Sequence, residues 1–302
     1  MEIKILTKEE LKHYLSSWCE LYRKCFSDPI EESIVAQRYI DNPYGDLLMC
    51  VAFDEDKIVA NYSVCPCEVY VNGNKYKAAI SLNTMTDPDY AGQGLLGKLA
   101  STLYSYMQEI GYSLVYGFPN YLSNKTFTSR LGWKDVYEFP TLEYVFKPCD
   151  TQNTEFKQCR FEEITDKPVT NKIEICKDRT YLNWRFDKTP DRQYLYANNG
   201  SGEWVIYKFF RDQINIIDTN LTSTDSLFDM FRYFQNISNE QNMKSITVWS
   251  KINSQSHYCY EKIGFINRYP IRYFAVLAFE NFDIDVFDHR NWLISMGDDN
   301  VY

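Results

Sequence analysis

A glycine-rich turn has the clearest chemical meaning in this sequence. Three glycines, Gly92, Gly94 and Gly97, lie between a β-like run and a helical pattern of apolar residues. Glycine allows a positive φ and a close approach of the backbone to a ligand. The first turn of the following helix adds N–H groups without intrahelical partners and a partial positive charge. This combination predicts a loop that binds the phosphates of a ligand.

The composition is that of a folded protein with an excess of acidic groups. The chain has 302 residues, a length that predicts two domains. Its residues are 45% hydrophobic and 17% aromatic, unlike those of a disordered chain. The formal net charge of −9 argues against binding to nucleic acid, which needs a basic surface. An anionic ligand must therefore be bound by local donors.

The nine cysteines are scattered, and their spacing fits no zinc site. We therefore expect free thiols and no metal. Cys65 and Cys67 lie in a β-like run, so both side chains should point to one face. No stretch approaches 18 apolar residues, and no apolar segment of a signal peptide follows Met1. These observations predict a cytoplasmic protein that does not cross a membrane.

The elements that must position the glycine turn can be predicted from periodicity. After a short strand, a capping box at Thr7–Glu10 begins a helix, and a second helix is expected over 31–40. Three strands follow, at 47–53, 57–71 and 76–86, and the last leads into the turn. Beyond it we expect a helix from Leu95, a strand over 113–118, a short helix over 122–131 and strands up to Lys147.

The second part of the chain repeats this order in outline. Residues 148–177 are polar and irregular and are interpreted in part as a linker, with a strand near 160–164. A hairpin (204–210 and 214–218), a helix (227–236), a strand (245–250), a helix (253–263) and a strand (271–279) follow. The segments 118–133 and 249–265 each contain a strand end, an Asn-containing turn, a helix and a Gly-aromatic pair. This repetition predicts duplication of one α/β unit with a mixed, mostly antiparallel sheet flanked by helices.

The motif Ala91-Gly-Gln-Gly-Leu-Leu96 resembles the acetyl-CoA loop of the GNAT superfamily of N-acetyltransferases, whose pattern is Gln/Arg-x-x-Gly-x-Gly/Ala. The anchor Gly94 is present, whereas Ala91 and Leu96 depart from the pattern. Asn120, Ser123 and Gly132-Trp133 resemble a later motif of the family. The whole chain resembles tandem GNAT proteins such as acetyltransferases of the enhanced-intracellular-survival type. The predicted units are a GNAT-like acetyl-CoA-binding domain at 1–148 and a degenerate GNAT-like domain at 155–302 that shapes the substrate cleft.

The resemblance implies direct transfer of an acetyl group from acetyl-CoA to a primary amine of a small molecule, in a monomer or homodimer. Pantetheine would lie between the separating strands at 81–86 and 113–118. An N–H near 82–84 would polarise the thioester carbonyl. The residues expected to bind the cofactor are Thr84, Met85, Thr86, Ala91, Gly92, Gln93, Gly94, Leu95, Leu96, Gly97, Asn120 and Ser123.

The sequence predicts the catalytic groups less directly. Many family members have a Tyr four residues before the later glycine, where this chain has Thr128 in the first half and Tyr260 in the second. The region 218–229, which corresponds to the glycine turn, contains no glycine, so the second half is expected not to bind the cofactor. The resemblance to the tandem relatives suggests the C-terminal carboxylate of Tyr302 as a base.

Two hypotheses therefore stay open at this point. The first is an active acetyltransferase. The alternative is a catalytically weak CoA-binding or scaffolding protein of the same fold, which Thr128 and the altered loop motif keep possible.

Overall fold

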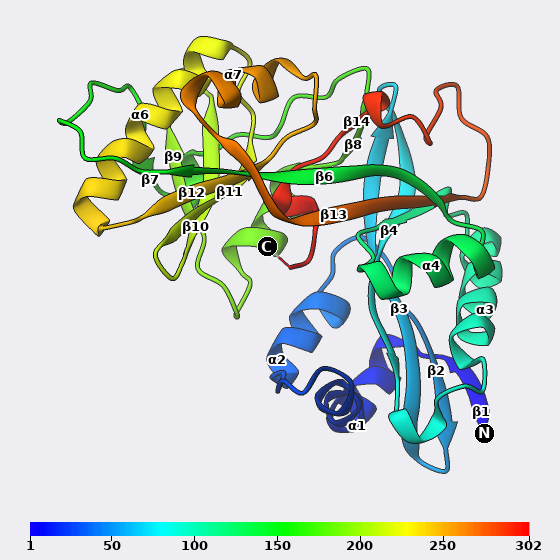
Figure 1. The fold of residues 1–302 in the computed structure, drawn as a ribbon. Helices are drawn as coiled ribbons and strands as arrows, with labels where there is room; N and C mark the ends of the chain where they lie inside the picture. Colours follow the sequence, from blue (N-terminus) through cyan, green and yellow to red (C-terminus); the bar gives the residue numbers. More distant parts are fainter. Residues whose placement is uncertain (302) are drawn as a thin grey trace.

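The structure is a computed structural model that describes residues 1–301, apart from the side chains of Tyr269 and Pro270. Tyr302 lies outside the described residues. Helices lie on both faces of one long, mixed β-sheet (Figure 1). The predicted α/β class, with a mixed sheet flanked by helices, is confirmed.

The first half contains the predicted elements close to their expected limits. The capping box forms as predicted, because Thr7 accepts from the Glu10 N–H while the Glu10 carboxylate accepts from the Thr7 N–H. The predicted helix over 31–40 is instead one α-helical turn followed by a π-helical turn, η1. The elements are β1 (Glu2–Ile5), α1 (Lys8–Phe26), α2 (Glu32–Val35), η1 (Ala36–Ile40), β2 (Leu48–Asp54), β3 (Lys57–Val71), β4 (Asn74–Thr86), η2 (Pro88–Tyr90), α3 (Leu95–Glu109), β5 (Leu114–Gly117), α4 (Tyr121–Arg130) and β6 (Lys134–Val145).

The second half begins with short elements that the linker interpretation did not include. The expected strand near 160–164 is wrong, because Phe161–Glu163 form a 3-10 turn and the strand lies before it. Strand β8 is buried where it pairs with the far end of β3. The elements are β7 (Lys157–Cys159), η3 (Phe161–Glu163), β8 (Ile173–Ile175), α5 (Arg179–Leu182), η4 (Asn183–Asp187), β9 (Leu195–Asn198), β10 (Trp204–Phe210), β11 (Gln213–Thr219), α6 (Thr224–Gln241), β12 (Ser245–Trp249), α7 (Gln255–Ile263), β13 (Ile266–Ala278), η5 (His289–Asn291), β14 (Trp292–Leu293) and η6 (Met296–Asp298).

The two halves exchange their last long strands. The order along the sheet is β1-β2-β3-β4-β5-β13-β6-β12-β11-β10-β9-β7. Strand β13 pairs with β5 of the first half, and β6 pairs with β12 of the second, both antiparallel. In Figure 1, β6 and β13 run side by side through the middle of the sheet. Each half is therefore completed by a strand from the other.

The order of elements and the strand directions occur twice. Strand β4 is followed by α3 and pairs in parallel with β5, and β11 is followed by α6 and pairs in parallel with β12. Helices α4 and α7 then lead to β6 and β13. The repeat begins with the pairs α2–η1 and α5–η4, each a single helical turn joined to a π-helical turn. These correspondences define equivalent positions in the two halves.

Helices cover the sheet with continuous apolar faces. Helix α3 packs one apolar side on β2, β3 and β5, and α1 packs on the opposite face of the sheet, against β2, β3 and β4. Helix α6 covers β10–β12 in the second half. A further core, which includes Trp204, Trp249 and Trp292, lies between the halves. No helix of the described part of the chain has the length and apolar composition to span a membrane.

Candidate functional site

Strands β4 and β5 separate where the candidate site begins. They pair in parallel only over 78–80 and 114–116, although β4 continues to Thr86. We call this separation, with residues 81–86 on one side, the first fork. Among the residues that the structure describes, backbone groups on this edge of β4 have no strand partner beyond Ile80. They are available to the amides of an extended ligand.

A buried polar network fixes the shape of the first fork. The pairing of β3 with β4 shifts between Asn61 and Ser63, and Asn83 opposite has a φ of 33°. The Asn61 side chain donates to the Asn83 carbonyl at 2.5 Å. The buried Tyr39 hydroxyl donates to the Asn83 side-chain oxygen at 2.7 Å. This bulge turns β4 away from β5, as bulges near functional sites commonly do.

The glycine turn follows the fork and has an open backbone. Gly92 and Gly94 have φ values of 77° and 69°, in the left-handed region that glycine favours. Gly94 is the N-cap of α3 and brings no side chain to the helix terminus. A Cβ atom added at Gly92, Gly94 or Gly97 would meet nothing within 4 Å. The first-turn N–H groups of α3 therefore face space that an anion can fill.

The other predicted loop residues divide into anchors and exposed positions. Leu95 is buried beneath the loop, and Leu96 is half-buried against the same core. Ala91 and Gln93 are exposed. The Ala91 N–H donates to the Pro88 carbonyl at 3.2 Å, which closes the turn before the glycines.

The remaining predicted cofactor positions lie at the end of β4 and at the start of α4, which follows β5. Thr84, Met85 and Thr86 are the last residues of β4, and Met85 is buried in the core beneath α1. The Asn120 side chain accepts from the Ser123 N–H at 2.8 Å and thereby caps α4. The Thr128 hydroxyl donates to the carbonyl of Asn124 within the same helix, at 2.9 Å.

A cavity lies on the face of the sheet opposite α3. Val64, Ala79 and Val115 pack beneath α3, so their chain neighbours Cys65, Ile80 and Tyr116 point to the other face and line the cavity. The space between its lining atoms is about 510 Å³, part of it open to solvent. The lining residues are Gln37, Arg38, Cys65, Pro66, Cys67, Ile80, Leu82, Tyr116, Tyr181, Trp184, Arg185, Thr189, Asp191, Arg192, Asp298 and Asn300.

Several of these groups were not predicted as site residues. Tyr116 lies in the strand predicted over 113–118, but the sequence analysis predicts no element for the second-half residues 181–192.

The two cysteine side chains point to one face as predicted, and burial raises the pKa of Cys65 to about 11 and that of Cys67 well above its usual value. Both thiols are therefore protonated at neutral pH and poor nucleophiles.

A buried ion-pair network holds the C-terminal segment, by which we mean residues 295–301, beside the cavity. Lys177 Nζ lies 2.8 Å from Asp298 and 2.5 Å from Asp218, and Lys167 lies 2.9 Å from Asp218. Burial favours the neutral form of Asp218, but Lys167 and Lys177 lower its pKa to about 2. The network brings Asp298 and Asn300 to the cavity wall. The predicted base, Tyr302, lies outside the described residues.

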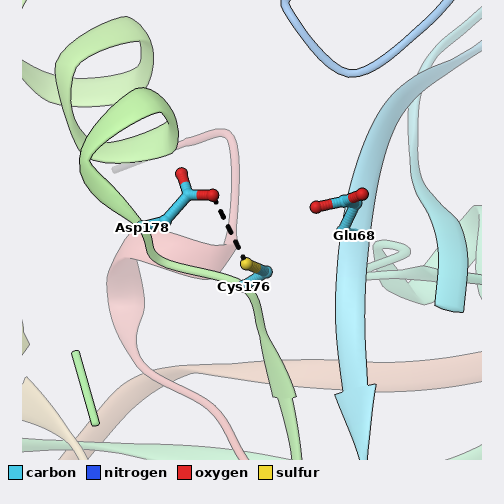
Figure 2. A group of neighbouring side chains, drawn as sticks. All are labelled: Glu68, Cys176 and Asp178. Carbon is cyan, nitrogen blue, oxygen red and sulfur yellow. Dashed lines mark hydrogen bonds between the residues drawn. The ribbon is translucent and has the colours of Figure 1, made fainter. Parts of the chain in front are cut away.

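A second group of titratable side chains joins the halves (Figure 2). The ligand atoms of Glu68, Cys176 and Asp178 lie within 4.8 Å of one another, close enough to hold a metal ion. Each carboxylate already has a partner, however. Glu68 lies 2.8 Å from Lys75 Nζ, and Asp178 caps α5 and accepts from the Tyr44 hydroxyl at 2.6 Å. With these partners the group connects β3 and the loop between η1 and β2 to the start of α5.

The equivalent fork in the second half is built differently. Strands β11 and β12 pair over 213–215 and 245–247 and then separate, and a bulge again lies beyond the pairing. We call this the second fork. Here Ser223 caps α6, and the carboxylate of Glu203 accepts from the N–H and hydroxyl of Thr222 and from the Ser226 hydroxyl. A carboxylate of the protein itself thus lies at this helix terminus.

Comparison with known proteins agrees with this architecture. A family model described as acetyltransferase (GNAT) domain matches residues 2–136. The chain therefore carries a GNAT acetyltransferase domain in its N-terminal part. A search of curated proteins found no significant match.

Solved structures share the fold over nearly the whole chain at low sequence identity. A conserved protein of unknown function from Enterococcus faecalis V583 matches with a TM-score of 0.68 and 12% identity, covering 92% of this chain and 72% of that one. The GCN5-related N-acetyltransferase from Anabaena variabilis gives 0.66 and 12%, with 91% and 72% covered. That from Kribbella flavida gives 0.63 and 9%, with 91% and 70% covered.

Proposed function

We propose that the protein transfers an acetyl group from acetyl-CoA to a primary amine of a small molecule. The observation that carries this proposal is the first fork, which ends in an open glycine turn on one side and reaches the cavity on the other. The pyrophosphate of the cofactor would bind the backbone N–H groups at Gly92–Gly97. The pantetheine arm would pair with the free edge of β4. The acetyl group would then reach the cavity between Leu82 and Tyr116.

The proposed reaction is a direct displacement. The amine nitrogen forms a bond to the thioester carbonyl carbon, and the bond from that carbon to sulfur breaks. A backbone N–H at the bulge of β4 would stabilise the charge on the carbonyl oxygen, a contribution worth about 10²–10³ in rate. The amine proton passes to a base or to water, and the thiolate leaves as the protonated thiol of CoA.

We propose the C-terminal carboxylate as that base. The support is the position of Asp298 and Asn300 on the cavity wall, close in sequence to the chain end. Deletion of Val301 and Tyr302 should lower kcat by about 10²-fold and leave the dissociation constant of acetyl-CoA unchanged. Unchanged turnover of the shortened protein would remove the terminus from the mechanism.

Binding of the cofactor is the first part of the proposal to test. Acetyl-CoA and free CoA should each raise Tm in proportion to the logarithm of ligand concentration. Release of CoA thiol over a panel of amines then distinguishes an enzyme from a CoA-binding or scaffolding protein. No rise in Tm at millimolar ligand would contradict both functions.

The second half is proposed as a copy that does not bind acetyl-CoA and that shapes the acceptor side of the cavity. The Glu203 carboxylate at the second fork agrees with this proposal. The domain limits at 148 and 155 stay predictions. So do a cytoplasmic location and a monomeric or homodimeric state.

A further inference from the structure

The two π-helical turns place equivalent arginines at the same cavity. Arg38 is the third residue of η1, and Arg185 is the third residue of η4. The turns meet directly, because the Gln37 side chain donates to the Trp184 carbonyl at 2.6 Å and the Trp184 indole donates to the Gln37 carbonyl at 2.9 Å. Both arginines line the cavity on the acceptor side of the first fork.

Arg185 has protein partners. Its guanidinium donates to the Tyr194 hydroxyl and to the Asp299 carbonyl, each at 3.0 Å. It also lies over the ring of Phe186, with 5.0 Å between the guanidinium carbon and the ring centroid. Arg185 therefore holds η4 against the C-terminal segment, which is a structural role.

Arg38 differs from its counterpart. It is only 9% exposed, and its guanidinium makes no hydrogen bond or ion pair with the residues that the structure describes. The carboxylates of the cavity have other cations close by. Asp191 lies 3.4 Å from Arg192, and Asp298 lies 2.8 Å from Lys177.

The electrostatics of Arg38 agree with this isolation. Burial lowers the pKa of Arg38, and its interactions with Tyr39 and Asp191 offset this only in part, whereas the interactions of Arg185 with Tyr194 and Tyr181 raise the pKa of that group despite burial. A buried, unpaired charge is unfavourable in a free protein. Such a group, facing a cavity, is typical of a site that a ligand of opposite charge completes.

We propose that Arg38 binds a carboxylate on the acceptor, so that the acceptor is an amine of the amino-acid type. This inference rests on the proposed acetyl transfer and specifies its substrate class. The planar guanidinium presents a two-pronged set of donors that matches a carboxylate. A single unpaired positive charge suits a monoanion. Asp191, on the same cavity wall, would repel the second charge of a phosphate group.

Stability of the variants separates a ligand site from a structural arginine. Arg38→Met replaces an unpaired charge by an apolar side chain of similar length, so its Tm should equal or exceed that of the wild type. Arg185→Met is the matched control at the equivalent position, and its Tm should fall because the Tyr194 and Asp299 oxygens lose their donor. A fall in Tm of Arg38→Met as large as that of Arg185→Met would overturn the proposal.

Binding can be measured without any reaction. With acetyl-CoA present, the carboxylate isovalerate should raise Tm of the wild type, and its uncharged amide and a short alkyl phosphate should not. Arg38→Met should weaken isovalerate binding at least about tenfold, as loss of one partner of a buried charge pair does. Arg38→Lys keeps the charge without the planar set of donors and should weaken it less. Binding of the phosphate in place of the carboxylate, or isovalerate binding that Arg38→Met leaves unchanged, would overturn the proposal.

Turnover then tests the substrate class. Leucine should have a kcat/KM at least about tenfold above leucinamide and isopentylamine, and Arg38→Met should remove this preference. Turnover of isopentylamine alone would contradict the carboxylate while leaving acetyl transfer intact. Absence of acetyl-CoA binding would contradict the proposed function, and binding of isovalerate measured without cofactor would still report on Arg38.

Discussion

The two forks of the sheet share a backbone plan and differ in what occupies their helix termini. At the first fork, the helix terminus is Gly94, which has no side chain, and the space beside the glycines is open. At the second fork, Ser223 caps the helix and Glu203 supplies a carboxylate to the backbone and hydroxyl groups before it. The same structural plan is thus left open for an external anion in one half and closed by an internal one in the other.

The two forks also differ in their contact with the C-terminal segment. It packs on the end of β11 so closely that a Cβ on Gly297 would lie 3.2 Å from a side-chain carbon of Ile217. The equivalent residue of the first half is Leu82, which lines the cavity proposed for the acceptor. One fork therefore serves as the support on which the segment is anchored, and the other reaches the proposed site.

The largest effect is expected from Lys177→Met, which removes the cation between the second fork and the C-terminal segment. Asp218 would keep Lys167, but Asp298 would lose its ion-pair partner while both stay buried. We expect a loss of about 3–5 kcal/mol in the free energy of unfolding, measured by urea denaturation. Lys244→Met is the control, because its pair with Asp212 is exposed and screened by solvent, so the loss should be much smaller. A small loss for Lys177→Met would mean that the network does not anchor the segment.

The same network predicts a pH dependence of stability. The pKa of Asp218 is about 2 in the folded protein, below the value of about 3.9 for an unperturbed aspartate. Its stabilising contribution is therefore fully present above about pH 4 and is lost as the pH falls toward 2. The urea midpoint of the wild type should fall over this range. Lys177→Met should show a weaker dependence, and an identical slope would contradict this assignment.

Substitution of Gly94 tests whether the open helix terminus is needed. Gly94→Val places a β-branched residue at a φ of 69°, at a cost of about 1–2 kcal/mol, and its side chain enters the space beside the helix terminus. The dissociation constant of acetyl-CoA should rise at least about tenfold by calorimetry. Gly200→Val is the matched control, with a φ of 73° in an exposed turn of the second half. It should lose similar stability and bind acetyl-CoA normally, whereas equal affinities for the two variants would contradict the loop assignment.

A smaller effect is expected when the internal anion of the second fork is neutralised. Hydrogen bonds from Ser226 and Thr222 lower the pKa of Glu203 despite burial, so the group is ionised at neutral pH. Glu203→Gln keeps the shape and should cost about 1–2 kcal/mol of stability, measured by urea denaturation. Acetyl-CoA affinity should not change, because the cofactor is assigned to the other fork. A changed affinity would show that the second fork contributes to cofactor binding.

Local sequence patterns predicted much of the fold, but they did not predict how the two halves are joined. The capping box at Thr7, the limits of β3 and the turn before α3 depend on neighbouring residues and could be predicted. The exchange of β6 and β13 depends on pairing between residues more than 100 positions apart, for which neither strand carries a local signature. Arg38 and Arg185 were missed for a similar reason. The pattern over 31–40 predicted one helix, and only the second copy at 179–187 reveals a repeated turn.

The smallest effect is expected at Thr128, the position where the family resemblance suggests a proton donor. Its hydroxyl donates to the Asn124 carbonyl inside α4, so the hydroxyl proton already takes part in a hydrogen bond within the helix. Thr128→Val should change kcat less than about twofold and stability by no more than about 0.5 kcal/mol, measured by CoA release and urea denaturation. Tyr260→Phe, at the equivalent position of the second half, should likewise leave turnover unchanged. A 10²-fold loss of kcat in Thr128→Val, the size typical of a removed general acid, would instead assign the hydroxyl to protonation of the leaving thiolate.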